Sequence, residues 1–321
     1  MPVRMSRSAQ RLLFNAVAFG AGVVLFVVVV RLSGRPLAEL LGRAVNARPP
    51  FLIAVVATLF VQAAIVARRW EILFGDAARP KAGSGRGFFF YASNMGLLMT
   101  SILPVVGNIG TVAASAKLER DVPVSRTVYA AAQGYAAGFV ILSAMLVPSA
   151  LSVLHLVGRT AGAAGLVLAA AALIAVSGRF YRFLWERMVA VLARIPRLGP
   201  RLAGFPLPEP ADAGRIIRWS LAAYAVVFVR HAVVLWAFDI PVDLLGFSLV
   251  YPIGYAVSSL GVTPGNLGTS ELGWFGALSA AGLDPANAAL YAFGQRVLNI
   301  GAVLVLAAVS AVLYQIARRR R

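Results

Sequence analysis

The chain has 321 residues, of which 60% are hydrophobic and only 13% are charged, and its mean hydropathy is +0.81. Soluble globular proteins carry about 25% charged residues, so this composition excludes an ordinary water-soluble domain. The chain contains no cysteine and two histidines. Disulfides, thiolate nucleophiles and Cys-ligated metals are therefore excluded, and His-based sites are disfavoured. We expect no cofactor, no metal and no catalytic residue.

The net charge of +18 has two explanations. In a soluble protein, such an excess suggests nucleic-acid binding. In this chain, the basic residues lie mainly in the short connectors between apolar runs. The positive-inside rule and the attraction of anionic headgroups explain that placement better. We therefore expect a membrane lipid or a lipid-linked substrate as the partner, and no nucleic acid.

A series of apolar runs predicts an all-α polytopic membrane protein, with residues 1–321 forming a single integral membrane domain. The runs are 12–30, 51–67, 88–103, 109–117, 127–147, 163–178, 216–238, 244–262, 268–281 and 288–316. Two of them, 109–117 and 268–281, are too short for the roughly 20 residues that a crossing needs. Each follows a break rich in Gly, Pro and Asn. We therefore predict about six full spans and two broken, re-entrant hairpins at 88–117 and 244–281.

The first run, 12–30, is longer than the hydrophobic region of a signal peptide, and no small-residue cleavage site follows it. We expect it to be a retained span. Most of the 30 Lys and Arg residues fall in loops that would share one side with both termini. This bias predicts a multi-pass plasma-membrane protein with both termini in the cytosol. The exception is 31–50, which has four arginines on the other side and the apolar spacing of a surface-lying helix.

Two short matches indicate an internal repeat. Gly107-Asn-Ile-Gly-Thr111 matches Gly265-Asn-Leu-Gly-Thr269, and Tyr129-Ala-Ala-Ala-Gln133 matches Tyr291-Ala-Phe-Gly-Gln295. We assign the first repeat to 88–147 and the second to 244–316, joined by a Pro-rich cytosolic connector at 194–214. The predicted crossings make the two hairpins enter the membrane from opposite faces. Inverted repeats with broken helices are typical of transporters, whose substrate site lies near the midplane.

The repeated motif supplies the first candidate site residues, Asn108 and Thr111 in one hairpin and Asn266 and Thr269 in the other. Each threonine opens a short apolar segment as a helix N-cap would. A half-helix that starts inside the membrane directs free N–H groups and a positive dipole end at an anion. Alternatively, the motif only shapes tight turns that pack the hairpin tips.

Glu271 and Arg296 are charged residues that lie within the predicted apolar runs. Glu271 lies in the first turn of the second half-helix, as a capping acid, a proton carrier or a counter-ion to a substrate amine. Arg296 lies within the last span and is expected to face the bundle interior. It is either a structural partner of Glu271 or a phosphate ligand that pairs with Glu271 when the site is empty.

Three further residues complete the candidate site. Arg230 lies midway along 216–238 and gives a weaker signal of the same kind as Arg296. Gln133 and Gln295 are repeat mates that offer neutral hydrogen bonds, either as contacts between helices or to substrate.

At these residues the chain resembles the lysylphosphatidylglycerol synthase transmembrane family, also called flippase-like membrane proteins. Pro264-Gly-Asn-Leu-Gly-Thr-Ser-Glu271 followed by Arg296 is similar to the family's Pro-x-Gly-x-Gly-x-x-Glu element and its last-span arginine. The first hairpin departs from the pattern, with Asn108 and Thr111 where the family usually has Arg and Glu. The resemblance implies movement of a lipid or lipid-linked headgroup between leaflets, and a stand-alone membrane domain without the synthases' aminoacyl-transferase domain.

The sequence therefore predicts a flippase that shields an anionic headgroup between two inverted hairpins. Two other functions remain open. One is an intramembrane lipid-modifying enzyme, although neither a nucleophile nor a pair of acids is visible. The other is a non-transporting membrane subunit of a lipid or glycan synthesis complex.

Overall fold

The computed structural model describes residues 7–75, 87–102, 112–113, 124–194, 208–241, 243–260 and 263–319. These residues form ten α-helices and one short 3-10 helix, with no strand among them. The elements are α1 (Arg7–Leu32), α2 (Leu37–Val45), α3 (Pro49–Phe74), α4 (Phe88–Ile102), α6 (Val124–Val153), α7 (Arg159–Ala193), α9 (Pro210–Ala237), α10 (Leu244–Ser259), η2 (Pro264–Asn266), α11 (Thr269–Ala280) and α12 (Pro285–Arg319).

The predicted all-α polytopic membrane fold is confirmed. Helices α3, α6, α7, α9 and α12 are long and apolar enough to cross a membrane. Together, α1 and α2 make a sixth candidate span, bent by 89° at the break between them. Outward-facing Ile53 and Phe139 are 72% and 71% exposed. Such large apolar side chains suit contact with lipid.

Local sequence explains where the helices begin. Prolines stand at the start of α3 and α9, where the missing N–H leaves no hydrogen bond unmade. The Asp243 carboxylate accepts the N–H of Gly246 at 2.5 Å and caps α10. Because α9 begins at Pro210, the last residues of the predicted connector 194–214 are helical. Residues 195–207 of that connector lie outside the described part of the chain.

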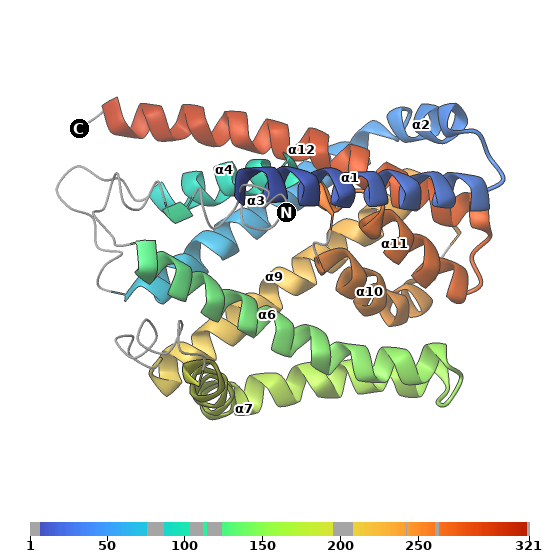
Figure 1. Cartoon of the computed structure of the whole chain (residues 1–321). Helices are drawn as coiled ribbons and strands as arrows, with labels where there is room; N and C mark the ends of the chain where they lie inside the picture. Colours follow the sequence, from blue (N-terminus) through green and yellow to red (C-terminus); the bar gives the residue numbers. More distant parts are fainter. Residues whose placement is uncertain are drawn as a thin grey trace, which may run out of the picture.

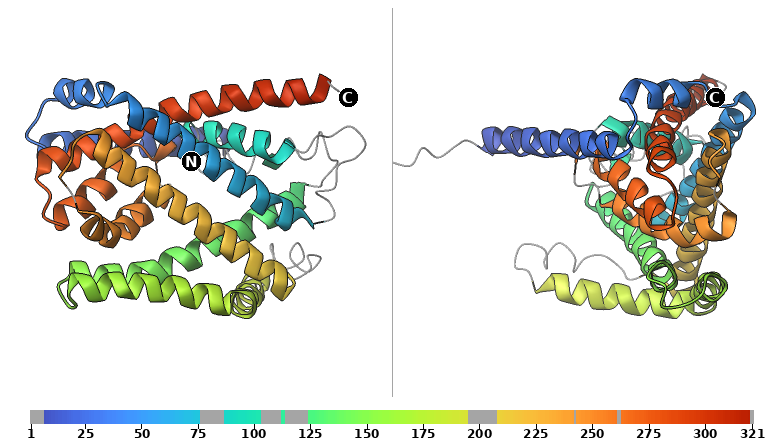
Figure 2. Two further views of the ribbon diagram at one scale, coloured as in Figure 1. Left: turned by 180° about the vertical axis from the view of Figure 1, so that it is seen from behind. Right: turned by 90° about the vertical axis from the view of Figure 1, so that its right-hand side faces the viewer.

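The long helices form the frame of the molecule. Helices α3 and α9 pack along each other, as the left view of Figure 2 shows. Helices α6 and α7 lie side by side at the lower edge of Figure 1, where α7 also packs on α9. Helix α12 lies along the opposite edge and contacts α2, α3 and α4. The shorter α10 and α11 pack on each other between these layers.

The core beside this short pair is aromatic. His231 on α9 stacks on Trp274 of α11 with ring centroids 4.5 Å apart. The Nδ1 atom of His231 lies 2.6 Å from the hydroxyl of Tyr291 on α12. Tyr251 of α10 is also within ring-contact distance of Trp274, at 5.8 Å. Aromatic contacts therefore fix α9, α10, α11 and α12 to one another.

The two predicted hairpins are described to different extents. In 244–281 the break is present, because α10 ends at Ser259 and α11 begins only at Thr269. In 88–117 the structure describes α4 and residues 112–113, whereas Asn108 and Thr111 lie outside the described residues. Helix α4 contacts both α12 and η2, so one leg of the first hairpin touches the break in the second.

Candidate functional site

The break between α10 and α11 is built from residues with left-handed backbone. Gly265, Asn266 and Gly268 have φ values of 59°, 57° and 77°. Glycine adopts this conformation without steric cost, and asparagine tolerates it better than most residues. The Asn266 side chain also donates from Nδ2 to the carbonyl of Ser258 at 2.7 Å. The repeated Gly-Asn-x-Gly motif therefore does shape a tight turn here, tied to the end of α10.

The break packs directly against α1. A Cβ atom on Gly268 would overlap the carbonyl oxygen of Gly22 and would lie 2.7 Å from the Cβ of Leu25. In the reverse direction, a Cβ on Gly22 would lie 2.7 Å from the carbonyl oxygen of Leu267. Glycine at both positions is what lets the two backbones approach each other.

Helix α11 begins one residue earlier than predicted. Its N-cap is Gly268, and Thr269 is the first helical residue rather than the cap. The Glu271 carboxylate accepts the N–H of Gly268 at 2.7 Å. Thr269 instead donates from Oγ1 to the carbonyl of Asn266 at 3.2 Å, and its hydroxyl lies 3.1 Å from that of Thr263. The glycine takes the cap because the chain turns with a positive φ there.

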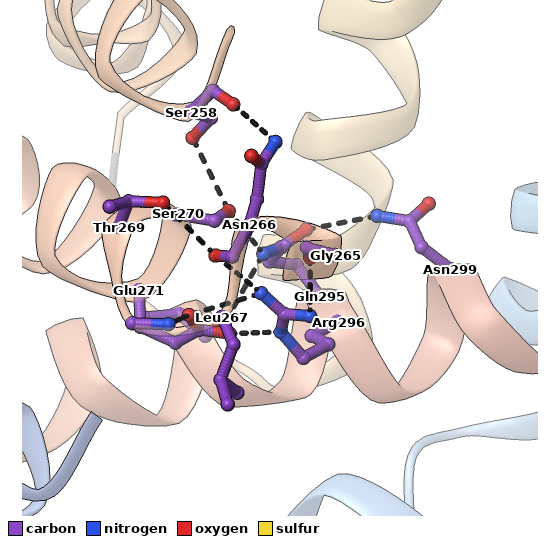
Figure 3. Close-up of polar contacts among 12 residues, drawn as sticks. Ser258, Gly265, Asn266, Leu267, Thr269, Ser270, Glu271, Gln295, Arg296 and Asn299 are labelled. Atoms are coloured by element: carbon purple, nitrogen blue, oxygen red, sulfur yellow. Dashed lines mark hydrogen bonds and ion pairs between the residues drawn. The ribbon is translucent and has the colours of Figure 1, made fainter. Parts of the chain in front are cut away.

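Arg296 of α12 closes the break, as Figure 3 shows. Its Nε and Nη2 atoms donate to the two carboxylate oxygens of Glu271, the latter at 3.2 Å. Its Nη1 and Nη2 atoms donate to the carbonyls of Gly265 and Asn266 at 2.9 and 2.8 Å. The Glu271 side chain is fully buried and that of Arg296 is 19% exposed. We call Gly265, Asn266, Gly268, Glu271 and Arg296 the clasp.

The clasp neutralises a buried carboxylate and satisfies backbone carbonyls that the break removes from helical hydrogen bonding. Beside it, Gln295 donates from Nε2 to the Ser270 hydroxyl at 3.4 Å and accepts from Asn299 Nδ2 at 2.9 Å. The buried glutamine therefore acts as a polar contact between α11 and α12.

The family model of the lysylphosphatidylglycerol synthase TM region matches residues 13–316. The chain belongs to this family. No curated protein and no solved structure matches the chain. Membership in the lysylphosphatidylglycerol synthase TM-region family indicates a membrane protein involved in lipid handling.

The structure brings together five of the residues predicted for the candidate site. They are Asn266, Thr269, Glu271, Gln295 and Arg296 (Figure 3). The pair with Glu271, which both roles considered for Arg296 include, is present here. Four of the five N–H donors of Arg296 are engaged in these bonds.

Arg230 and Gln133 make their contacts elsewhere. Arg230 on α9 is 8% exposed and donates from Nη1 to Oε1 of Gln62 on α3. Its buried Nε has no hydrogen-bond partner among the described residues. Gln133 on α6 is buried, and its backbone carbonyl accepts the Tyr181 hydroxyl of α7 at 2.6 Å.

The sequence missed Arg69. The apolar run 51–67 stops just before Arg68 and Arg69, so hydropathy places both arginines in a loop. Helix α3 instead continues to Phe74, and its two arginines point to different surroundings. Arg68 is exposed and pairs with Glu71, whereas Arg69 lines an internal cavity. The available signal was spacing, because Gln62 lies two helical turns before Arg69 on the same face and lines the same cavity.

Proposed function

We propose that this protein moves a lipid, or a lipid-linked anionic headgroup, between the leaflets of the cytoplasmic membrane. The observation that carries the proposal is the break between α10 and α11, held by the buried Glu271–Arg296 pair. Unwound backbone within a membrane is tolerated where protein or a wet cavity covers it, and transporters place such breaks at their substrate sites. We therefore treat 244–281 as a re-entrant hairpin that borders the transport path.

The clasp has a part in the proposed cycle. It holds the hairpin while the site is empty, and an anionic headgroup then competes with Glu271 for Arg296. Glu271, released from the arginine, couples to a proton or to a substrate amine. The 19% exposure of Arg296 supports access from the path. The contact between α4 and η2 supports the proposal that the second hairpin faces the first across the site.

We place both termini in the cytosol, in line with the distribution of Lys and Arg between the loops. We also propose transport rather than catalysis, since the arginine and the Gly268 amide already engage the buried carboxylate of Glu271. Lipid or a lipid-linked substrate is then the partner of this chain.

Reconstitution into liposomes with a leaflet-sensitive fluorescent lipid tests the proposal. We expect the wild-type chain to accelerate exchange between leaflets, and Glu271→Gln and Arg296→Gln to slow it by about tenfold or more. Arg35→Gln is the matched control, because it removes an arginine from an exposed pair with Glu39. Absence of exchange by folded wild-type protein would overturn the proposal. Unchanged exchange in both clasp variants would overturn the role of the clasp alone.

A further inference from the structure

A cavity of about 160 Å³ with a mixed apolar and polar lining lies between α3, α4 and α6. None of the residues that line it belongs to the clasp. Its polar lining comes from Gln62 and Arg69 of α3, Ser93 and Asn94 of α4, and Tyr135 of α6. A single water needs roughly 10–15 Å³, so the cavity accommodates a much larger group. Polar and charged residues inside a membrane bundle are costly, and they mark ligand or ion pathways.

The guanidinium of Arg69 has a free edge. Its Nη1 donates to the Ser220 hydroxyl on α9 at 3.2 Å. Among the described residues, its buried Nε has no hydrogen-bond partner, and the bond from Nη1 is the one that the guanidinium makes. The Nε and Nη2 hydrogens point the same way in a guanidinium. That edge is the one that forms two parallel hydrogen bonds with a carboxylate or phosphate.

A second donor of the cavity is also unused. Ser93 is 5% exposed, and its buried hydroxyl has no hydrogen-bond partner in the part of the chain that the structure describes. Its neighbour Asn94 is 1% exposed and is fixed by donation from Nδ2 to Ser310 at 2.7 Å. Buried polar groups nearly always have partners. A ligand that offers acceptor oxygens would supply the missing partner to both Arg69 and Ser93.

The charge around the cavity is positive. Across the part of the chain that the structure describes, neither Arg69 nor Arg230 is paired with a carboxylate. Arg230 instead bonds to Gln62, which lines the cavity. The seven residues from Gln62 to Arg69 span ~10 Å of helix. Two unneutralised arginines therefore lie along one seam between α3 and α9, and an anion is the ligand they favour.

One wall of the cavity reaches the outer face of α6. Tyr135, which lines the cavity, is 48% exposed. Val128 and Phe139 share this face of α6, seven residues before and four residues after Tyr135, and they are 48% and 71% exposed. On a membrane-spanning helix such a face meets acyl chains. An anion that enters here is therefore carried by a lipid.

We infer that this cavity binds the phosphate group of an anionic phospholipid. Arg69 donates to two phosphate oxygens from Nε and Nη2, Ser93 is a further donor, and the acyl chains lie along α6. The inference rests on the proposed function and names the headgroup class for it. With both termini in the cytosol, the end of α3 that carries Arg69 lies in the cytosolic half of the membrane. The cavity is then the loading site for the cytosolic leaflet.

Binding to the purified full chain in detergent tests the inference. The titrants are dihexanoyl phosphatidylglycerol, dihexanoylglycerol without phosphate, and inorganic phosphate, read by native mass spectrometry. We expect only the phospholipid to bind well, and Arg69→Gln to weaken its binding by about tenfold or more.

A glycine pair on α6 supplies a second variant and its control. A Cβ on Gly134 would sit 3.6 Å from Nη2 of Arg69, an ordinary contact that leaves the fold intact but fills space beside the guanidinium. A Cβ on Gly138, one turn later, would meet nothing within 4 Å. We expect Gly134→Ala to weaken phospholipid binding several-fold (roughly the effect of a blocked donor) and Gly138→Ala to leave it unchanged.

The outcomes separate the two proposals. Phospholipid binding that is unchanged in both Arg69→Gln and Gly134→Ala overturns the cavity site, whatever the transport assay shows. Inorganic phosphate that binds as tightly as the phospholipid overturns the lipid as the source of the anion. Because binding is measured without transport, a wild-type chain that binds through Arg69 but moves no lipid overturns the proposed function and leaves the cavity site standing.

Discussion

The molecule holds two partly buried arginines in contrasting states. Arg296 lies in the clasp, where Glu271 and the carbonyls of the break take four of its donors. Arg69 lines the α3–α4–α6 cavity, and its guanidinium makes one hydrogen bond within the described residues, to Ser220. The first arginine is neutralised and the second is not. An arginine inside the helix bundle therefore does not by itself indicate a ligand site. Its free donors decide whether it can bind a ligand.

The contrast predicts different costs of removal. Where a guanidinium neutralises a buried acid, its loss leaves an uncompensated charge, and the main effect should be a lower free energy of unfolding. Where a guanidinium has no carboxylate partner, its loss also removes its own desolvation penalty. The main effect should then be weaker ligand binding. Measurements of stability on matched variants test each half of the comparison.

The largest expected effect comes from breaking the clasp pair. Arg296→Gln leaves the Glu271 carboxylate, which is fully buried, without its cation. We expect a loss of about 3–5 kcal/mol in the free energy of unfolding, measured by denaturant titration of the purified protein in detergent. The double variant Glu271→Gln with Arg296→Gln carries neither charge and should regain most of that loss. A double variant no more stable than Arg296→Gln would show that the carbonyls of Gly265 and Asn266 matter more than the charge.

Next in size is the close contact between the break and α1. Gly268→Ala puts a methyl group onto the Gly22 carbonyl at a residue with φ of 77°. Overpacking and left-handed strain together should lower the free energy of unfolding by about 2–3 kcal/mol. Gly276→Ala is the control on the same helix, because its Cβ would meet nothing within 4 Å. Equal thermal unfolding midpoints for the two variants would contradict the packing described for the break.

The sequence predicts the fold well because its apolar runs are long. The runs 51–67 and 127–147 each fall inside a helix of the structure, and the helices extend beyond them at both ends. The run 216–238 lies in α9 except for its last residue, Phe238, which is the C-cap. Hydropathy ends a span at the first charges, whereas a helix continues as long as its backbone hydrogen bonds do. For this reason α3 runs past Arg68 and Arg69 to Phe74.

The candidate site was predictable where it is local in sequence. The motif around Asn266 dictates a left-handed turn, and a carboxylate in the first turn of α11 suits the helix dipole. Arg69 was not predictable in this way. Its surroundings come from α4, α6 and α9, and only the packing of those helices creates the cavity. The sequence shows which charged side chains lie within helices, but it does not show which residues of other helices contact them.

A smaller effect separates shape from hydrogen bonding within the clasp. Asn266 has φ of 57°, and its side chain donates to Ser258. Asn266→Gly keeps the backbone conformation and loses the bond, for an expected cost of about 1 kcal/mol. Asn266→Ala loses the bond and adds left-handed strain, for an expected total of roughly 2 kcal/mol. Thermal unfolding midpoints of the two variants, measured under the same conditions, give the contribution of the left-handed strain. If alanine is no worse than glycine, the turn does not depend on the left-handed residue.

The smallest expected effect on stability is that of Arg69→Gln. The variant loses one hydrogen bond to Ser220 and leaves that buried hydroxyl unpaired, a cost of about 1 kcal/mol. It also removes a partly buried cation that has no carboxylate partner in the described residues, which offsets the loss. The net change in the free energy of unfolding should therefore stay within about 1 kcal/mol of zero. Denaturant titration checks it beside Arg68→Gln, which removes an exposed pair with Glu71 and should also change little. A loss as large as that of Arg296→Gln would mean that Arg69 is a structural cation too, and the contrast between the two arginines would fail.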